Sequence, residues 1–130
     1  MIIEQGLTVF LTTYPPLMDL QGTRLYPDNL PQSPTLPATV YQRISGVVDY
    51  SQSGQSEPQN ARFQFTCWAV DPLAAKLLAR VLKTAVSGYR GLMGTVEIQE
   101  AFVENETGGQ EPDTGLYREI VDVIFGFKEA

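Results

Sequence analysis

The chain has 130 residues, 43% of them hydrophobic, with a formal net charge of −6, one cysteine and no histidine. This length fits a single domain, residues 1–130, that can bury its own core. The missing histidine excludes a Ser-His-Asp triad, a Cys-His pair and ordinary zinc sites, and no apolar run is long enough to span a membrane.

The first element is predicted to be a short helix. Ile3, Leu7 and Leu11 recur at helical spacing, and the helix should end before Pro15-Pro16. Six of the nine prolines lie from Pro15 to Pro37, where no helical or strand period is visible. We therefore expect an extended connection there, with a short strand at Thr23–Tyr26.

Two strands are predicted next, at Thr39–Val48 and Arg62–Val70, because both are rich in β-branched and aromatic residues. In the second strand the residues Phe63, Phe65, Cys67 and Ala69 alternate with more polar ones. Such alternation places them on one buried face. The polar segment Asp49–Ala61 would then be an oversized loop at the tip of a hairpin.

A second helix should begin at Asp71-Pro72, since aspartate caps free amides and proline suits the first turn. It should end at Ser87-Gly88. Its predicted buried residues are Ala74, Leu77, Leu78, Val81, Leu82, Ala85 and Val86. Lys76, Arg80 and Lys83 share the opposite side, which is either a solvated face or a surface that pairs with the acidic C-terminal third of a neighbouring copy.

A second hairpin is predicted from Thr95–Val103 and Leu116–Phe127, across the polar loop Glu104–Gly115. The apolar residues of the last strand fall on both of its faces, which favours a strand that is covered on both sides. The elements together predict an α+β fold: a single antiparallel β-sheet of four to five strands with two helices packed on it.

The charge is unevenly distributed along the chain. Residues 97–130 hold nine acidic and two basic side chains, a net charge of −7, whereas residues 1–96 carry +1. A surface of this sign lacks the basic footprint of nucleic-acid-binding proteins. The acidic residues either aid solubility or form a surface that DNA passes without binding.

Few residues could carry chemistry. Cys67 lies in the middle of a predicted strand with no neighbouring base, which favours a core position over a nucleophile. The acids between Glu104 and Asp113 lack the ligand spacing of a calcium loop. We therefore expect no catalytic residue, no metal site and no cofactor, and a protein that is not an enzyme.

The predicted N-terminal helix and three later segments carry a resemblance to a known family. The segments are Leu36–Ser45, which enters the first long strand, Ala61–Ala69 running into the Asp71-Pro72 helix, and Thr114–Arg118 followed by a strand that ends in Phe125-Gly-Phe127. In their order and spacing they resemble the tail-completion family of long-tailed bacteriophages, also called tail terminators or tail-to-head joining proteins.

The resemblance implies a small structural protein without catalytic residues. Such proteins assemble as hexameric rings on the head-proximal end of the tail tube, end tube growth and provide the surface that joins the head. The implied partners are further copies of the chain, the tail-tube protein and the head-completion or connector protein, while DNA passes through without specific binding. The implied locations are the host cytoplasm during assembly and then the virion tail, with no membrane association.

The resemblance also implies that the two polar loops order at interfaces. The candidate interface residues in them are Ser51, Gln52, Gln55, Glu57, Glu106, Gln110, Glu111 and Asp113. From the charge asymmetry, Glu97, Glu100 and Glu104 are the candidate acids of a lumen or its rim. Two alternatives stay open: a head-completion or connector protein at the same junction, and a small non-enzymatic module that binds a peptide or ligand in a sheet groove.

Overall fold

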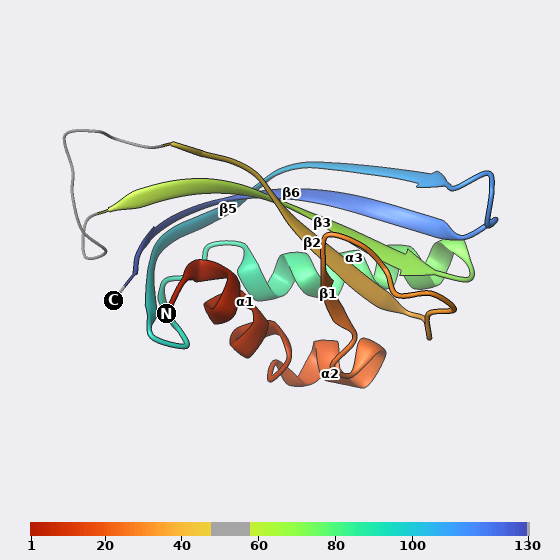
Figure 1. Ribbon diagram of the computed structural model, residues 1–130, viewed down its shortest axis with the longest axis horizontal. Helices are drawn as coiled ribbons and strands as arrows, with labels where there is room; N and C mark the ends of the chain where they lie inside the picture. The colour runs from red at the N-terminus through yellow and green to blue at the C-terminus, as the bar shows by residue number, and fades with distance from the viewer. Residues whose placement is uncertain (48–57, 130) are drawn as a thin grey trace.

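Six strands form one curved sheet in the computed structural model, which describes residues 1–47 and 58–129 (Figure 1). Its order is β1-β2-β3-β6-β5-β4. The strands are β1 Leu25–Pro27, β2 Ala38–Val47, β3 Gln59–Ala69, β4 Gly91–Met93, β5 Val96–Gln110 and β6 Tyr117–Lys128. β1 is parallel to β2, and all other neighbours are antiparallel. The α+β class is confirmed, but the predicted purely antiparallel sheet of four to five strands is wrong.

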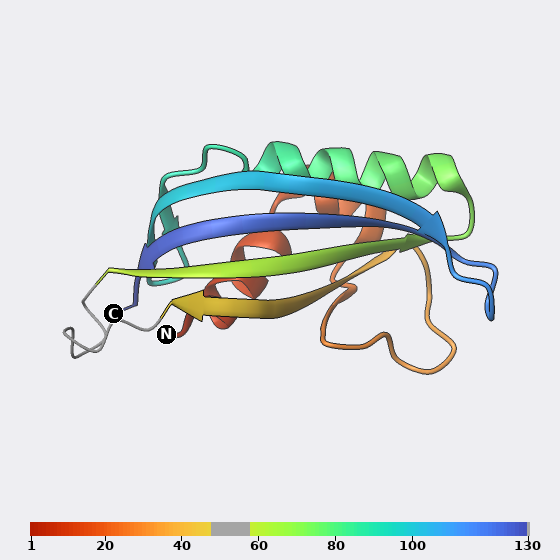
Figure 2. The ribbon, with the colours of Figure 1, turned by 90° about the horizontal axis from the view of Figure 1, so that it is seen from above.

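Three helices, not the predicted two, lie on one face of the sheet (Figure 1). They are α1 Ile3–Leu11, α2 Pro15–Gln21 and α3 Pro72–Val86. Figure 2 looks onto the opposite face, which no helix covers in the described part of the chain. We call this the open face. None of the three helices has the length and apolar character needed to cross a membrane.

The N-terminal helix is confirmed, and the short strand predicted at Thr23–Tyr26 is found as β1, shifted by one to two residues; the predicted extended connection is wrong for Pro15–Gln21, which is helical. Pro15 and Pro16 occupy the first turn of α2, where a missing backbone N–H costs nothing. Gly22 ends this helix at a φ of 59°, and β1 follows. The sequence predicts that Pro15 and Pro16 only mark the end of the first helix, whereas in the structure they also begin the second helix.

The core lies between the helices and the covered face of the sheet. Phe63 and Phe65 of β3 are fully buried, which confirms the face predicted for this strand. Phe125 and Phe127 of β6 are fully buried as well, but within the described residues helices cover β6 on one side and not on both. Each such side chain contributes about 1.5–3 kcal/mol through burial. Gly6 lets α1 approach β4, because a Cβ there would lie 2.5 Å from the carbonyl oxygen of Met93.

The predicted loop Glu104–Gly115 is mostly strand. β5 continues to Gln110 and pairs with β6 down to Tyr117, with register shifts at Ile98/Glu100 and Val103/Asn105. Only a tight turn joins the two strands. The pairing overrides the low strand propensity of Gly108 and Gly109, because each strand supplies the hydrogen-bonding partner that the other needs.

The other predicted loop, Asp49–Ala61, falls largely outside the described residues. Its last three residues, Gln59–Ala61, belong to β3 and pair with Val47 and Gly46 of β2 and with β6. The first hairpin is thus confirmed as a pairing of β2 with β3. The candidate residues Ser51, Gln52, Gln55 and Glu57 lie outside the described residues.

Candidate assembly surfaces

Cys67 has the environment of a core residue. Its side chain is fully buried, and this burial raises the pKa of the thiol to about 12. The hydroxyl of Thr39 lies 3.9 Å from the sulfur, and no basic group contacts it. Among residues 1–47 and 58–129, no three His, Cys, Asp or Glu side chains come together as metal ligands would.

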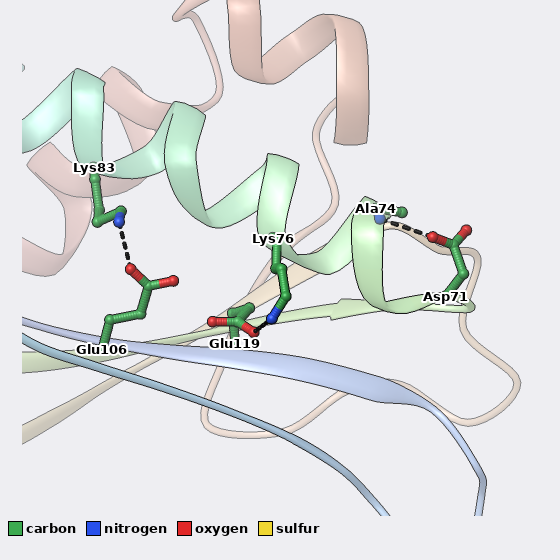
Figure 3. Close-up of polar contacts among 6 residues, drawn as sticks. All are labelled: Asp71, Ala74, Lys76, Lys83, Glu106 and Glu119. Atoms are coloured by element: carbon green, nitrogen blue, oxygen red, sulfur yellow. Dashed lines mark hydrogen bonds and ion pairs between the residues drawn. The ribbon is translucent and has the colours of Figure 1, made fainter.

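The two lysines of α3, Lys76 and Lys83, pair with acids of the same chain (Figure 3). The Nζ of Lys76 lies 3.1 Å from Oε1 of Glu119, and Lys83 donates a short hydrogen bond to Glu106. The prediction of a purely solvated face is therefore wrong for these two lysines. They do meet the acidic C-terminal third, but within one copy. Arg80 faces solvent, and none of the described residues pairs with it.

The two ion pairs differ in burial. The Glu119 side chain is only 7% exposed, whereas the Lys76 side chain is 61% exposed. Gly108 of β5 makes room for Glu119, because a Cβ at that position would overlap its carboxylate. The hydrogen bond from Lys83 holds the pKa of Glu106 below its ordinary value. The pairs therefore tie the inner side of the β5–β6 hairpin to α3.

The turn of this hairpin is held by its own side chains. The Glu111 carboxylate accepts hydrogen bonds from the Asp113 amide and from the Thr114 hydroxyl, both at 2.9 Å. These bonds lower the pKa of Glu111. The Gln110 amide donates to the carbonyl of Gly115 at 3.0 Å. The candidate interface residues Gln110, Glu111 and Asp113 thus form a compact turn at the end of the long hairpin rather than an extended loop.

The three candidate lumen acids share the open face. Glu97 lies opposite Lys128, and Glu100 lies opposite Gly126. Glu104, at the second register shift, forms an ion pair with Arg62 of β3 at 2.6 Å. The structure thus brings the three together along β5. It separates them from Glu106, which points to α3 on the covered side.

The outer side of α3 carries an apolar surface that was not predicted. Leu73 is 76% exposed and Leu77 50% exposed, so the predicted burial of Leu77 is wrong. Ala75 and Ala79 are buried in its place. Small side chains on the inner side bring the helix close to the sheet, and this shifts the buried face. The sequence signal for this buried face was the pair of alanines four residues apart, Ala75 and Ala79.

A shallow hollow on the open face bears on the ligand-binding alternative. It lies between β2, β3 and the segment after β1, and its volume is about 150 Å³. Its lining includes Asn29, Gln42, Gln64 and Trp68. Ligand sites usually occupy about 300–1,000 Å³ and are mainly apolar. This hollow is therefore smaller than a usual ligand site. Two other hollows, one between α3 and the β5–β6 hairpin and one at Leu73 and Leu77 on α3, have volumes of about 400 and 350 Å³, so cavity size leaves the ligand-binding alternative open.

The comparison with known families identifies the chain. A family model described as "Tail completion protein gp17" matches residues 5–127. The chain belongs to this family. It is therefore a structural phage tail protein and not an enzyme, and its place is in the phage particle, where it assembles with other phage structural proteins.

A solved structure supports the fold of this tail completion protein. One chain of "Virion of native gene transfer agent (GTA) particle" is similar over 91% of this chain and 88% of that chain, with a TM-score of 0.65. The two are 16% identical, so the likeness concerns the fold alone. No curated protein matched the sequence.

Proposed function

We propose that this tail completion protein forms a hexameric ring on the head-proximal end of the tail tube, ends tube growth and provides the surface to which the head joins. The observation that carries the proposal is the family match over residues 5–127.

The hairpin turn is proposed as one docking element of the ring. Gln110, Glu111 and Asp113 are held in place before any partner binds, through hydrogen bonds within the turn. A prearranged surface loses less conformational entropy on binding than a flexible one does. Glu106 accepts a hydrogen bond from Lys83 on the covered side of the hairpin, so it would affect docking only by holding the hairpin against α3. Ser51, Gln52, Gln55 and Glu57 stay proposed interface residues.

A tube-growth experiment tests the proposal directly. Purified protein is added to tail-tube subunits that are polymerising, and tube lengths are measured by negative-stain imaging. We expect shorter tubes that no longer elongate when fresh subunits are added. Heads added afterwards should join only the tubes that carry the protein. Tubes that keep growing at the same rate would contradict the proposal. Binding to head connectors alone would favour the head-completion alternative.

The open face is proposed to line the lumen through Glu97, Glu100 and Glu104. Carboxylates at the lumen would keep DNA phosphates from binding to the wall, whereas lysines would release counterions and hold the DNA. Replacing all three acids with lysine should lower genome delivery, which is scored only in particles whose ring formation and head joining have been verified. The control replaces Asp19, an exposed acid of α2 on the helix-covered side, with lysine. Normal delivery from the triple variant would contradict the lumen assignment and leave the ring proposal standing.

A further inference from the structure

Both sides of the sheet have long open strand edges. β4 pairs with β5 only along Val96–Ile98, so Gln99–Gln110 has no strand beyond it in the described part of the chain. On the other side, β1 pairs with β2 only along Thr39–Tyr41, so among residues 1–47 and 58–129 no strand lies beyond Gln42–Val47. Unpaired backbone groups at an edge are a template for a further strand.

The backbone hydrogen bonds show which residues of β5 face outward. The amide of Gly88 donates to the carbonyl of Ala101 at 2.8 Å, so the peptide groups of Ala101 point away from β6. Ala101 lies opposite Phe125, and β6 pairs with β3 without a register shift. Every second residue of β6, counted from Phe125, therefore directs its peptide groups towards β3 and away from β5. The β5 residues that lie opposite these β6 residues are Val103, Glu106, Gly108 and Gln110. Their amides and carbonyls face outward.

The same reasoning applies to β2. Its Tyr41 carbonyl accepts a hydrogen bond from the amide of Asp28, and its Thr39 amide donates to the carbonyl of Arg24. These odd-numbered residues direct their peptide groups away from β3. Arg43 is next in the series, before the register shift between Arg43 and Ser45. The edge of β2 thus also presents free amides and carbonyls.

We propose that the open edge of β5 pairs with the open edge of β2 from a second copy, so that adjacent copies in the ring share one continuous sheet. This inference rests on the proposed ring. β2, β3, β6 and β5 alternate in direction, so β2 and β5 run opposite ways. When the ring axis runs along the strands, the rotation from one copy to the next leaves the direction of every strand unchanged. β5 of one copy and β2 of the next are therefore antiparallel, like the strand pairs on either side of the junction.

The charges favour this pairing over pairing of two like edges. The segment Gln99–Gln110 holds three acids and no base, whereas Gln42–Val47 holds Arg43 and no acid. Two β5 edges side by side would repel each other. Arg43 already pairs with Glu4 at 3.0 Å, so it adds little attraction to the acids of β5. Pairing of β5 with β2 is favoured mainly because it avoids the repulsion between two acidic β5 edges. A contact between two different edges of one chain is head-to-tail, and such contacts give a closed ring when the rotation from copy to copy closes, as the proposed hexamer requires.

Disulfide cross-linking tests the junction. Gln42 lies on the open face of β2, and Asn105, Thr107 and Gly109 lie on the open face of β5, because their partners Gln64, Asp122, Ile120 and Arg118 do. The test variants combine Gln42→Cys with Asn105→Cys, Thr107→Cys or Gly109→Cys, three registers two residues apart. Cys67 can stay, because its buried thiol has a pKa raised to about 12.

We expect one of the three double variants, oxidised as a ring, to give a ladder of covalent oligomers up to the full ring on a non-reducing gel. Gln42→Cys combined with Leu92→Cys is the control, since Leu92 is 62% exposed on β4, outside the open edge, and should give no ladder. Rings of the correct mass with no ladder in any register would overturn the inference and leave the ring standing. A covalent dimer from Gln42→Cys alone would show pairing of two β2 edges and overturn it as well.

A second measurement needs no substitution. In the ring, the amides of Glu106 and Gly108 should exchange with deuterium about tenfold more slowly, or slower still, than in the free chain, because they become hydrogen-bonded. Unchanged exchange in a verified ring would overturn the inference. Failure of the chain to self-associate, alone or on tubes, would instead overturn the proposed function itself.

Discussion

Lys76 and Lys83 anchor the hairpin to α3 in different ways. Lys76 compensates the carboxylate of Glu119, which lies almost fully away from water. A buried carboxylate without a partner is costly, whereas a pair between exposed groups contributes little. The Lys76–Glu119 pair thus stabilises the fold mainly because it offsets the free-energy cost of burying the Glu119 carboxylate. Lys83 and Glu106 are both partly exposed, so solvent screens their attraction more strongly.

Replacing Lys76 with methionine should therefore destabilise the protein. We expect a loss of about 1–2 kcal/mol, because Glu119 loses its charged partner while the aliphatic packing of the side chain is kept. The measurement is urea unfolding at neutral pH. Arg80→Met on the same helix is the control and should change the free energy of unfolding by less than about 0.5 kcal/mol. Equal effects of the two variants would refute a specific role for Lys76.

The Glu106–Lys83 pair should give a pH-dependent contribution to stability. The folded chain holds the pKa of Glu106 below its ordinary value of 4.5, so the unfolded chain takes up its proton first as the pH falls. The contribution is complete above about pH 4.5 and is lost as the pH falls through the lowered pKa. Glu106→Gln should thus be less stable than the wild type at pH 7, and the difference should shrink towards pH 3. A constant difference between pH 7 and pH 3 would argue against this.

At the scale of elements, β3 and β6 supply the fully buried phenylalanines of the core. Phe65 is fully buried and belongs to the alternating face that the sequence predicted. Phe65→Ala should lower the free energy of unfolding by about 3–5 kcal/mol. Gln64→Ala, on the open face of the same strand, should cost less than about 1 kcal/mol. Urea unfolding of both variants measures the difference, and a loss below about 1 kcal/mol for Phe65→Ala would mean that the wrong face was assigned.

Elements with a strong local signal were predictable from the sequence. α3 is marked at its start by Asp71, whose carboxylate accepts a hydrogen bond from the Ala74 amide at 2.8 Å, and β3 by its regular alternation. α2 was missed because two prolines can end a helix or begin one, and only tertiary packing decides. The outer half of β5 was missed because its polar, glycine-containing sequence becomes a strand only through pairing with β6.

The candidate site was predictable in part. The choice of Glu97, Glu100 and Glu104 follows from the charge asymmetry of the sequence, whereas their common position on the open face depends on the two register shifts in β5. The separation of Glu106 from them could not be predicted, because it depends on the register shift between Val103 and Asn105. That shift moves Glu106 to the side that faces Lys83.

At the scale of the whole molecule, the chain presents two different faces and two different edges. Helices cover one face of the sheet, and the other is open (Figure 1). One edge is acidic, and the other carries no acid along its open part. A chain with unlike edges has the geometry for head-to-tail association with its own copies. Exposed Leu73 and Leu77 add an apolar surface on α3, away from the sheet.

The most direct test of the central claim is cryo-electron microscopy of tail tubes assembled with the purified protein. The account predicts a single six-fold ring of this chain at one end of each tube, with the open faces of its copies turned to the lumen. Heads should attach only at that end. Density for the chain along the tube wall, or tube ends that lack it after saturating addition, would contradict the claim.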